Sequence, residues 1–296
     1  PEITVKALQD PKVYESCKPL VVGDAAILER ACGFVGAKCT IHPVADPSEG
    51  LYEHGIIDIL DLGLLKPEDF AIGQVSAAAG DAAFRYVRKV IELAMDGKVD
   101  ATVTNPLNKE AMNLAGHHFS GHTEIYAYYT GTEHYTMMLA HKDLRVVHVS
   151  THVSLREACD RVKKDRVLEV IEIANKACKD MGIENPRIAV AGLNPHCGEN
   201  GLFGREEIEE ITPAIEAAKA EGIIGVVGPC PPDSVFSQAI GGWYDIVVCM
   251  YHDQGHIPLK TVGFVYDREK QEWKAVEGVN VTLGLPIIRA SVDHGT

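Results

Sequence analysis

The sequence predicts an α/β protein whose core is a largely parallel β-sheet flanked by helices. Two observations lead to this fold class. From residue 75 onward, helix-like and strand-like segments alternate, which is typical of βα units. The segments 144–150, 187–193 and 244–251 are short runs rich in Val, Ile and Ala, as expected of parallel strands buried on both faces.

The intervening helices are predicted from their caps and apolar spacing. Asp81 is placed to cap a helix that ends at Gly97 and is followed by a strand over 99–104. A second helix is predicted to begin at Asp165. The charged segment 266–277 indicates a solvent-exposed insertion without chemistry of its own.

Composition limits the function classes. The chain has 296 residues, of which 46% are hydrophobic, enough for one large α/β unit or two closely packed lobes. A formal net charge of −14 argues against nucleic acid as a partner, because phosphate backbones are bound by clustered Lys and Arg. No apolar run approaches the roughly 20 residues that span a bilayer, so we expect no membrane partner.

The cysteines and the chain ends add two expectations. The 8 cysteines are scattered without a CxxC pair, which suits a reducing compartment, and we expect a cytoplasmic protein. The abrupt beginning at Pro1 and end at Thr296 indicate that both termini are truncated.

Three predicted strands each run into a histidine just beyond their C-terminal end, at His152, His196 and His252. In open α/β sheets, ligands bind outside the carboxyl ends of the strands, so these imidazoles lie where a site is expected. Any one of them alone could be an ordinary polar residue at a strand end, and no local zinc motif such as HExxH occurs. Their shared position favours a divalent metal site.

Several cationic and polar residues are candidates for binding an anion. Asn108 and Lys109 follow another strand, and His122 and Thr123 follow a glycine at the predicted start of a helix. Asp253, Lys260, Asn280 and Arg289 lie near the same edge. In so acidic a chain, Lys260 and Arg289 are plausible anion clamps, although isolated cations are more often solvated surface.

A glycine occurs every third position at Gly198, Gly201 and Gly204, so the backbone there can approach a ligand closely. This is not a GxGxxG motif, and that dinucleotide fingerprint is absent from the chain. The residues alone leave two other classes open. Three histidines and an aspartate could activate water in a metal-dependent hydrolase, or the site could bind a sugar phosphate without catalysis.

Taken together, seven motifs closely resemble the 4-hydroxythreonine-4-phosphate dehydrogenase family over nearly the whole chain. They are Asn105-Pro-Leu-Asn-Lys109, Gly121-His-Thr-Glu124, Ser150-Thr-His152, Gly192-Leu-Asn-Pro-His196, Pro231-Pro-Asp233, Tyr251-His-Asp-Gln-Gly255 and Ser291-Val-Asp-His-Gly-Thr296.

The resemblance implies an isocitrate/isopropylmalate dehydrogenase-like fold of two α/β lobes spanning 1–296, with the active site in the cleft between them. It also implies NAD binding without a Rossmann fingerprint, a divalent cation (Zn, Mg, Co or Mn), and a homodimer with an active site shared between subunits.

The resemblance further implies roles for individual residues. The metal ligands correspond to His152, His196 and His252, one of which reaches in from the neighbouring subunit. The residues that hold the substrate correspond to His122, Thr123, Lys260, Asn280 and Arg289. Lys260, Asp233 and Asp253 correspond to groups near the reacting hydroxyl, and Gly198, Gly201 and Gly204 are candidates for cofactor contact.

Within the family, the segments Gly198-Glu-Asn-Gly-Leu-Phe-Gly204 and Gln254-Gly-His-Ile-Pro-Leu-Lys260 are more similar to the D-threonate 4-phosphate branch than to the vitamin B6 branch. The expected reaction is therefore oxidation of this phosphorylated four-carbon acid at C3, then decarboxylation to dihydroxyacetone phosphate. The alternative substrate is 4-hydroxy-L-threonine 4-phosphate, which differs mainly at C2.

Overall fold

The computed structural model describes residues 1–292, except for the side chains of residues 274–276. The last four residues of the Ser291–Thr296 motif lie outside the described residues. The chain forms two compact units, Pro1–Thr132 and a second unit that begins at Glu133. The predicted cleft between two lobes stays a prediction, and each unit is described by itself.

The first unit contains a small parallel sheet with strand order β1-β3-β2. Helices α1 and α3 pack on this sheet through Val5, Leu28 and Ala31 against Ile57 and Ile59 of β3. Its elements are α1 (Glu2–Ala7), α2 (Pro11–Ser16), β1 (Val21–Gly23), α3 (Ala25–Val35), β2 (Thr40–Val44), β3 (Ile56–Asp61), α4 (Ala77–Met95), β4 (Ala101–Thr104), α5 (Lys109–Leu114) and α6 (His122–Thr130).

The predicted start of the helix at Asp81 is wrong. Helix α4 begins one turn earlier, because Ser76 caps it by accepting a hydrogen bond from Ala79 N–H. Asp81 lies inside the helix, where its carboxylate forms ion pairs with Arg85 and His117. A carboxylate near the start of a helix resembles a cap in sequence even when its partners are side chains.

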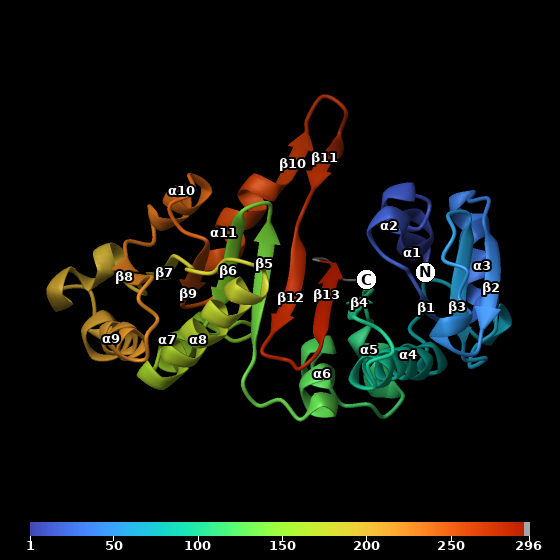
Figure 1. Cartoon of the computed structure of the whole chain (residues 1–296), viewed down its shortest axis with the longest axis horizontal. Coiled ribbons are helices and arrows are strands. Elements are labelled where there is room, and N and C mark those ends of the chain that lie inside the picture. The colour runs from blue at the N-terminus through green and yellow to red at the C-terminus, as the bar shows by residue number, and fades with distance from the viewer. Residues whose placement is uncertain (293–296) are drawn as a thin grey trace. The chain divides into compact units, whose positions relative to one another are not determined.

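The second unit is built on a mixed sheet with the order β13-β12-β5-β6-β9-β7-β8 (Figure 1). β6, β9, β7 and β8 are parallel neighbours, whereas β5 and β13 run opposite to them. Its elements are β5 (Thr136–His141), β6 (Leu144–His148), α7 (Leu155–Arg161), α8 (Lys164–Asp180), β7 (Ile188–Ala191), α9 (Thr212–Ala220), β8 (Val226–Cys230), α10 (Val235–Ile240), β9 (Ile246–Cys249), α11 (His252–Gly263), β10 (Phe264–Asp267), β11 (Glu272–Val276), β12 (Val279–Leu283) and β13 (Ile288–Val292).

Helices cover both faces of this sheet. One face packs on α8 and α9 through residues such as Val147, Ile188 and Val248. The alternate residues of the same strands, such as Val146 and Val247, point to the face covered by α10 and α11. This two-sided burial explains the continuous apolar runs in the sequence, and the predicted α/β fold class is confirmed.

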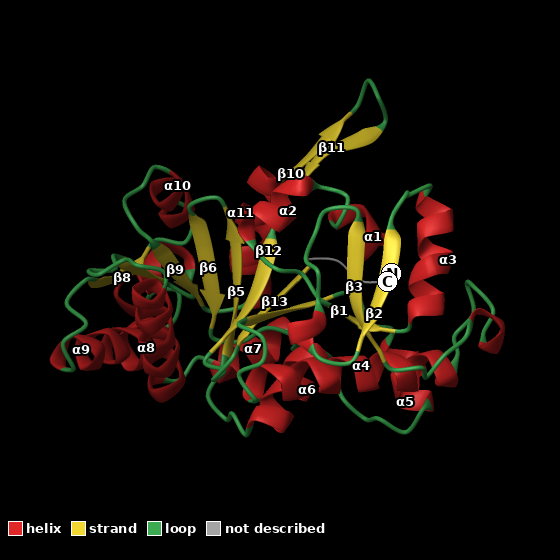
Figure 2. Cartoon of the chain, turned by 45° about the vertical axis from the view of Figure 1, so that its right-hand side comes forward, coloured by secondary structure: helices red, strands yellow, loops and turns green. Residues whose placement is uncertain are grey.

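The charged segment 266–277 lies almost entirely within the antiparallel hairpin β10–β11 and its turn. Figure 2 shows this hairpin extending away from the sheet of the second unit. Tyr266 and Trp273 are exposed on it and their rings contact edge to face. Within residues 1–292, no helix combines the length and the apolar character needed to cross a bilayer.

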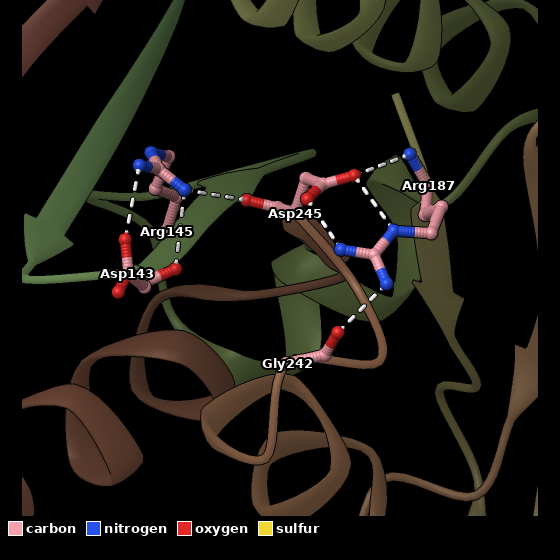
Figure 3. Close-up of polar contacts among 5 residues, drawn as sticks. All are labelled: Asp143, Arg145, Arg187, Gly242 and Asp245. Carbon is pink, nitrogen blue, oxygen red and sulfur yellow. Dashed lines mark hydrogen bonds and ion pairs between the residues drawn. The ribbon is translucent and has the colours of Figure 1, made fainter. Parts of the chain in front are cut away.

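An ion-pair network joins the amino ends of β7 and β9, opposite the end where the histidines follow the strands (Figure 3). Arg187 donates from Nε and Nη2 to the two carboxylate oxygens of Asp245, at 3.1 and 2.7 Å, and from Nη1 to Gly242 O. Arg145 donates to Asp245 O. The side-chain bond from Arg187, against a smaller cost of burial, holds the pKa of Asp245 below its ordinary value.

We expect Asp245→Asn to destabilise the protein by about 1–2 kcal/mol near neutral pH, because one charge-assisted, two-point contact is lost. A carboxyl with a lowered folded-state pKa stabilises the fold above its unfolded pKa, and this contribution is lost as the pH falls through the folded value. Urea unfolding should therefore show the gap between wild type and variant closing below about pH 4. Asp143→Asn is the control, since that carboxylate is 95% exposed; an equal effect there would contradict the prediction.

Candidate active site

The three predicted metal-binding histidines follow strands that are direct neighbours in the sheet. β6 pairs with β9 and β9 pairs with β7, all in parallel, and His152, His196 and His252 come after their respective carboxyl ends. The predicted position of these residues at one edge of the sheet is confirmed. Their role as metal ligands stays a prediction.

Hydrogen bonds tie the three loops to one another. Ser150 Oγ donates to Met250 O at 3.3 Å, which links the loop of His152 to that of His252. The buried Gln254 accepts from Met250 N–H and donates to Gly192 O at 2.8 Å, which links α11 to the end of β7. The backbone around the histidines is therefore held by bonds inside one unit.

The structure brings two of the three histidines together. The rings of His152 and His252 have centroids 5.7 Å apart, and His252 Nδ1 lies 2.7 Å from Asp253 Oδ1. A carboxylate on Nδ1 orients the imidazole so that Nε2 can face a ligand. Within residues 1–292, no group of three or more His, Cys, Asp or Glu side chains is arranged to hold a metal ion, so His196 does not join this pair.

His196 lies in an unusual left-handed turn, Pro195–Gly201. Its φ is 52°, and Cys197, Glu199 and Asn200 also have positive φ values of 56°, 45° and 55°. For L-residues this conformation costs on the order of 1–2 kcal/mol each, so neighbouring contacts must stabilise it. The turn carries His196 into a pocket of about 350 Å³.

Glu207 is the residue that holds this turn in place. Its side chain is 2% exposed, and Oε1 accepts from the backbone N–H groups of Leu193 and Asn194 at 2.8 and 2.7 Å. Oε2 accepts from Asn194 Nδ2 at 3.0 Å. Glu207 is not predictable from the sequence, since nothing local distinguishes it from the neighbouring acidic residues at 206, 209 and 210.

The repeated glycines have a structural reason within the same turn. A Cβ on Gly198 would lie 2.8 Å from Glu207 Oε2, and one on Gly204 would lie 2.4 Å from Asn194 Nδ2. Close packing of the backbone on these two side chains therefore requires glycine at both positions. Contact of Gly198, Gly201 and Gly204 with a cofactor stays a prediction.

Cys197 lines the same pocket and its Sγ donates to Pro229 O at 3.4 Å. Burial, with the nearby Glu207, raises the pKa of its thiol to about 11. The thiol is therefore protonated at neutral pH, which does not suit a nucleophile. Asp233 is an exposed residue of the turn before α10 and contributes to the field at Cys197.

Two further histidines stand beside His252, and the sequence analysis missed both. His256 lies one helical turn beyond His252 on α11, and His148 is the last residue of β6. Burial lowers the pKa of His148 to about 3 and that of His256 to about 4, so both rings are neutral. The spacing of four between 252, 256 and 260 was the available signal, because it places these residues on one face of a helix.

The predicted substrate residues of the second unit share one face of the sheet. Asn280 and Arg289 alternate with residues that pack on α8, so they point to the face that α11 covers. Arg289 is 3% exposed and donates from Nη1 to Thr282 Oγ1 at 2.8 Å. In the sheet, Thr282 pairs with Met137, and the carbonyl oxygen of Met137 lies 3.2 Å from Nδ1 of His148. Because His148 ends β6, the Arg289 side chain, which is bonded to Thr282, lies level with the carboxyl end of β6.

The remaining predicted residues are placed as follows. Asn280 is half-buried, and its Oδ1 has no hydrogen-bond partner among the described residues, while Nδ2 lies 3.1 Å from Met137 Sδ. Lys260 Nζ lies 5.3 Å from the ring centroid of Phe264. His122 and Thr123 begin α6 in the first unit, after Gly121, and Asn108 caps α5 before Lys109 as predicted.

Comparison with known proteins gives this arrangement its context. The family model described as pyridoxal phosphate biosynthetic protein PdxA matches residues 15–296. The chain is 48% identical over 297 residues to the D-threonate 4-phosphate dehydrogenase of Cupriavidus necator, covering 100% of this chain and 85% of that protein. It is 47% identical over 297 residues to the 4-hydroxythreonine-4-phosphate dehydrogenase of Desulforapulum autotrophicum, with coverage of 100% and 84%.

Among solved structures, the 4-hydroxythreonine-4-phosphate dehydrogenase of Klebsiella pneumoniae aligns with a TM-score of 0.88 at 44% identity, covering 100% of this chain and 87% of that one. The fold, the strand-end site and these relatives define an enzyme class, the dehydrogenases that act on a hydroxyl group of a phosphorylated substrate. Within that class, the chain belongs to the PdxA family. The family resemblance drawn from the seven motifs is confirmed.

Proposed function

We propose that this enzyme oxidises D-threonate 4-phosphate at C3 with NAD⁺ and then releases carbon dioxide to give dihydroxyacetone phosphate. The observations that carry the proposal are the His152–His252 pair at the carboxyl edge of the sheet, and Asn280 and the buried Arg289 on the sheet face that α11 covers. A relative that is 48% identical over the whole chain is named for this substrate. The proposal includes the more general statement that the substrate is a phosphorylated four-carbon acid.

The donor set fits a divalent cation. His252 with Asp253 behind it, and His152 close by, supply imidazole nitrogens, which favour Zn²⁺ or Co²⁺ over Mg²⁺. His196 would complete the set from a second copy of the chain, in a homodimer with a shared site. The bound cation would supply Lewis-acid polarisation of the substrate oxygens.

The cationic residues account for binding the anionic substrate. Arg289, buried and oriented by Thr282, presents a planar fork suited to a carboxylate or phosphate, and Asn280 offers an amide oxygen to a hydroxyl. Lys260, His122 and Thr123 complete the binding set that we propose. Holding the phosphate at one end aligns C3 for reaction, so binding energy of a remote group contributes to the rate.

Proton transfer falls to Lys260 and the two aspartates. In the first step the C3 hydroxyl loses its proton to one of these groups while the hydrogen on C3 passes as a hydride to NAD⁺, which leaves a keto group at C3. In the second step the bond between C2 and the carboxylate carbon breaks, carbon dioxide leaves, and the resulting enolate takes a proton at C2. Asp253 is oriented by His252, and Asp233 is an exposed turn residue on a neighbouring loop. NAD is proposed to bind without a Rossmann motif.

The test follows NADH absorbance with D-threonate 4-phosphate and with 4-hydroxy-L-threonine 4-phosphate, each with and without a chelator. We expect chelator-sensitive turnover of the first substrate. Preference for the second would assign the reaction to that substrate, for which a relative of 47% identity is named. Absence of NADH with both would overturn the proposal and favour the metal-dependent hydrolase or the sugar-phosphate binding protein.

A further inference from the structure

Helix α11 carries three polar residues of interest along one face. His252, His256 and Lys260 are spaced by four, so their side chains follow one another along the same face of the helix. In the proposed function, His252 binds the cation and Lys260 binds the substrate. His256 lies between them, is 6% exposed, and has no role in the proposed function.

The side-chain rings of His256 and His252 stack face to face. The two centroids are 3.6 Å apart with an interplanar angle of 11°, which is a stacked pair. His256 Nδ1 lies 2.9 Å from His252 O and, in the neutral ring, donates to that carbonyl. His256 is thereby fixed by the backbone of the residue on which its ring lies.

A second buried ring supports His256 from the sheet. The centroid of His148 lies 4.8 Å from that of His256, and His148 Nε2 is a buried atom without a hydrogen-bond partner among the described residues. A Cβ on Gly255 would lie 2.6 Å from His148 Nε2, so the helix can approach this ring only because residue 255 is glycine. His148 thus fills the space behind the stack.

Two of the contacts that orient His252 differ in strength. The Asp253 carboxylate that meets Nδ1 is 68% exposed, so water competes for it and the bond contributes little alone. The ring of His256 is buried and covers one face of the His252 imidazole. Removal of the stack would leave His252 free to change its side-chain torsions.

We propose that His256 is a positioning residue that aligns His252 for cation binding through ring stacking, with His148 as its support. The inference rests on the proposed function, in which His252 is a metal ligand. Residues that orient metal-ligating histidines typically change metal affinity by about 10–100-fold when removed. Stacking requires only a flat ring, so phenylalanine at this position retains the effect, whereas alanine does not.

The experiment titrates full-chain apoprotein with Co²⁺ and follows its visible absorption, with Zn²⁺ competition to obtain the affinity. We expect His256→Ala to weaken binding by about 10–100-fold and His256→Phe to remain within about threefold of wild type. The matched control is His117→Ala, because His117 stacks on Phe84 at 3.8 Å and 13° in the first unit, which contains none of the predicted metal ligands.

A kinetic readout separates positioning from a general structural defect. His256→Ala should need more metal for half-maximal NADH formation, while kcat at saturating metal stays near wild type. Wild-type affinity in His256→Ala, or equal loss in His256→Phe with an unchanged melting temperature, would overturn the positioning role. A wild-type protein that binds no Co²⁺ would instead overturn the proposed function.

Discussion

A mixture of two inactive variants, His196→Ala and His252→Ala, is expected to regain about one quarter of wild-type activity after subunit exchange. Each variant alone should lose on the order of a thousandfold in kcat/KM, because loss of a ligand removes several kcal/mol of charge stabilisation. Recovery follows if the two histidines serve one site from different chains. Half of randomly formed dimers are then mixed, and each mixed dimer has one site with all its ligands.

The structural basis is that His196, among the described residues, forms no metal-holding group with the other two histidines. His152 and His252 have rings 5.7 Å apart, yet no three-residue metal group exists within residues 1–292. Mixing is measured by NADH formation after mild denaturation and refolding of the combined variants. Each variant refolded by itself is the control. Dimers that exchange subunits without any recovery of activity would contradict a shared site.

The second large effect is expected at Glu207, where alanine should reduce the free energy of unfolding by about 2–4 kcal/mol. The substitution leaves the buried backbone N–H groups of Leu193 and Asn194 without their acceptor. It also removes the contact that holds a turn with several left-handed residues, so His196 should lose its position and metal-dependent activity should fall.

Urea unfolding of Glu207→Ala and Glu207→Gln measures this effect. Gln retains one acceptor oxygen but directs an N–H₂ group at existing donors, so it should be intermediate. Glu209→Ala is the control, since Glu209 lies in the same acidic segment, is 56% exposed and forms an ion pair with the surface residue Arg205. A loss at Glu209 as large as at Glu207 would mean that the acidic segment matters for its charge and not for the buried bonds.

Much of the candidate site was accessible from local signals. Short apolar runs mark parallel strands because both faces of the sheet are buried, and the residue after such a strand lies at a predictable edge. His152, His196 and His252 were found in this way. The start of α4 was predicted wrongly because Ser76 and Asp81 are both acceptable caps, and only the accepted bond from Ala79 decides between them.

By itself, then, the sequence determined the α/β class, the family, and the edge of the sheet where the histidines lie, because these depend on periodicity and on motifs within short segments. The tertiary structure decided which side chains meet. His148 and His256 become neighbours of His252 only through the pairing of β6 with β9 and the packing of α11 on that face. Glu207 gains its role only when the chain folds back on Leu193 and Asn194, since long-range contacts leave no period in the sequence.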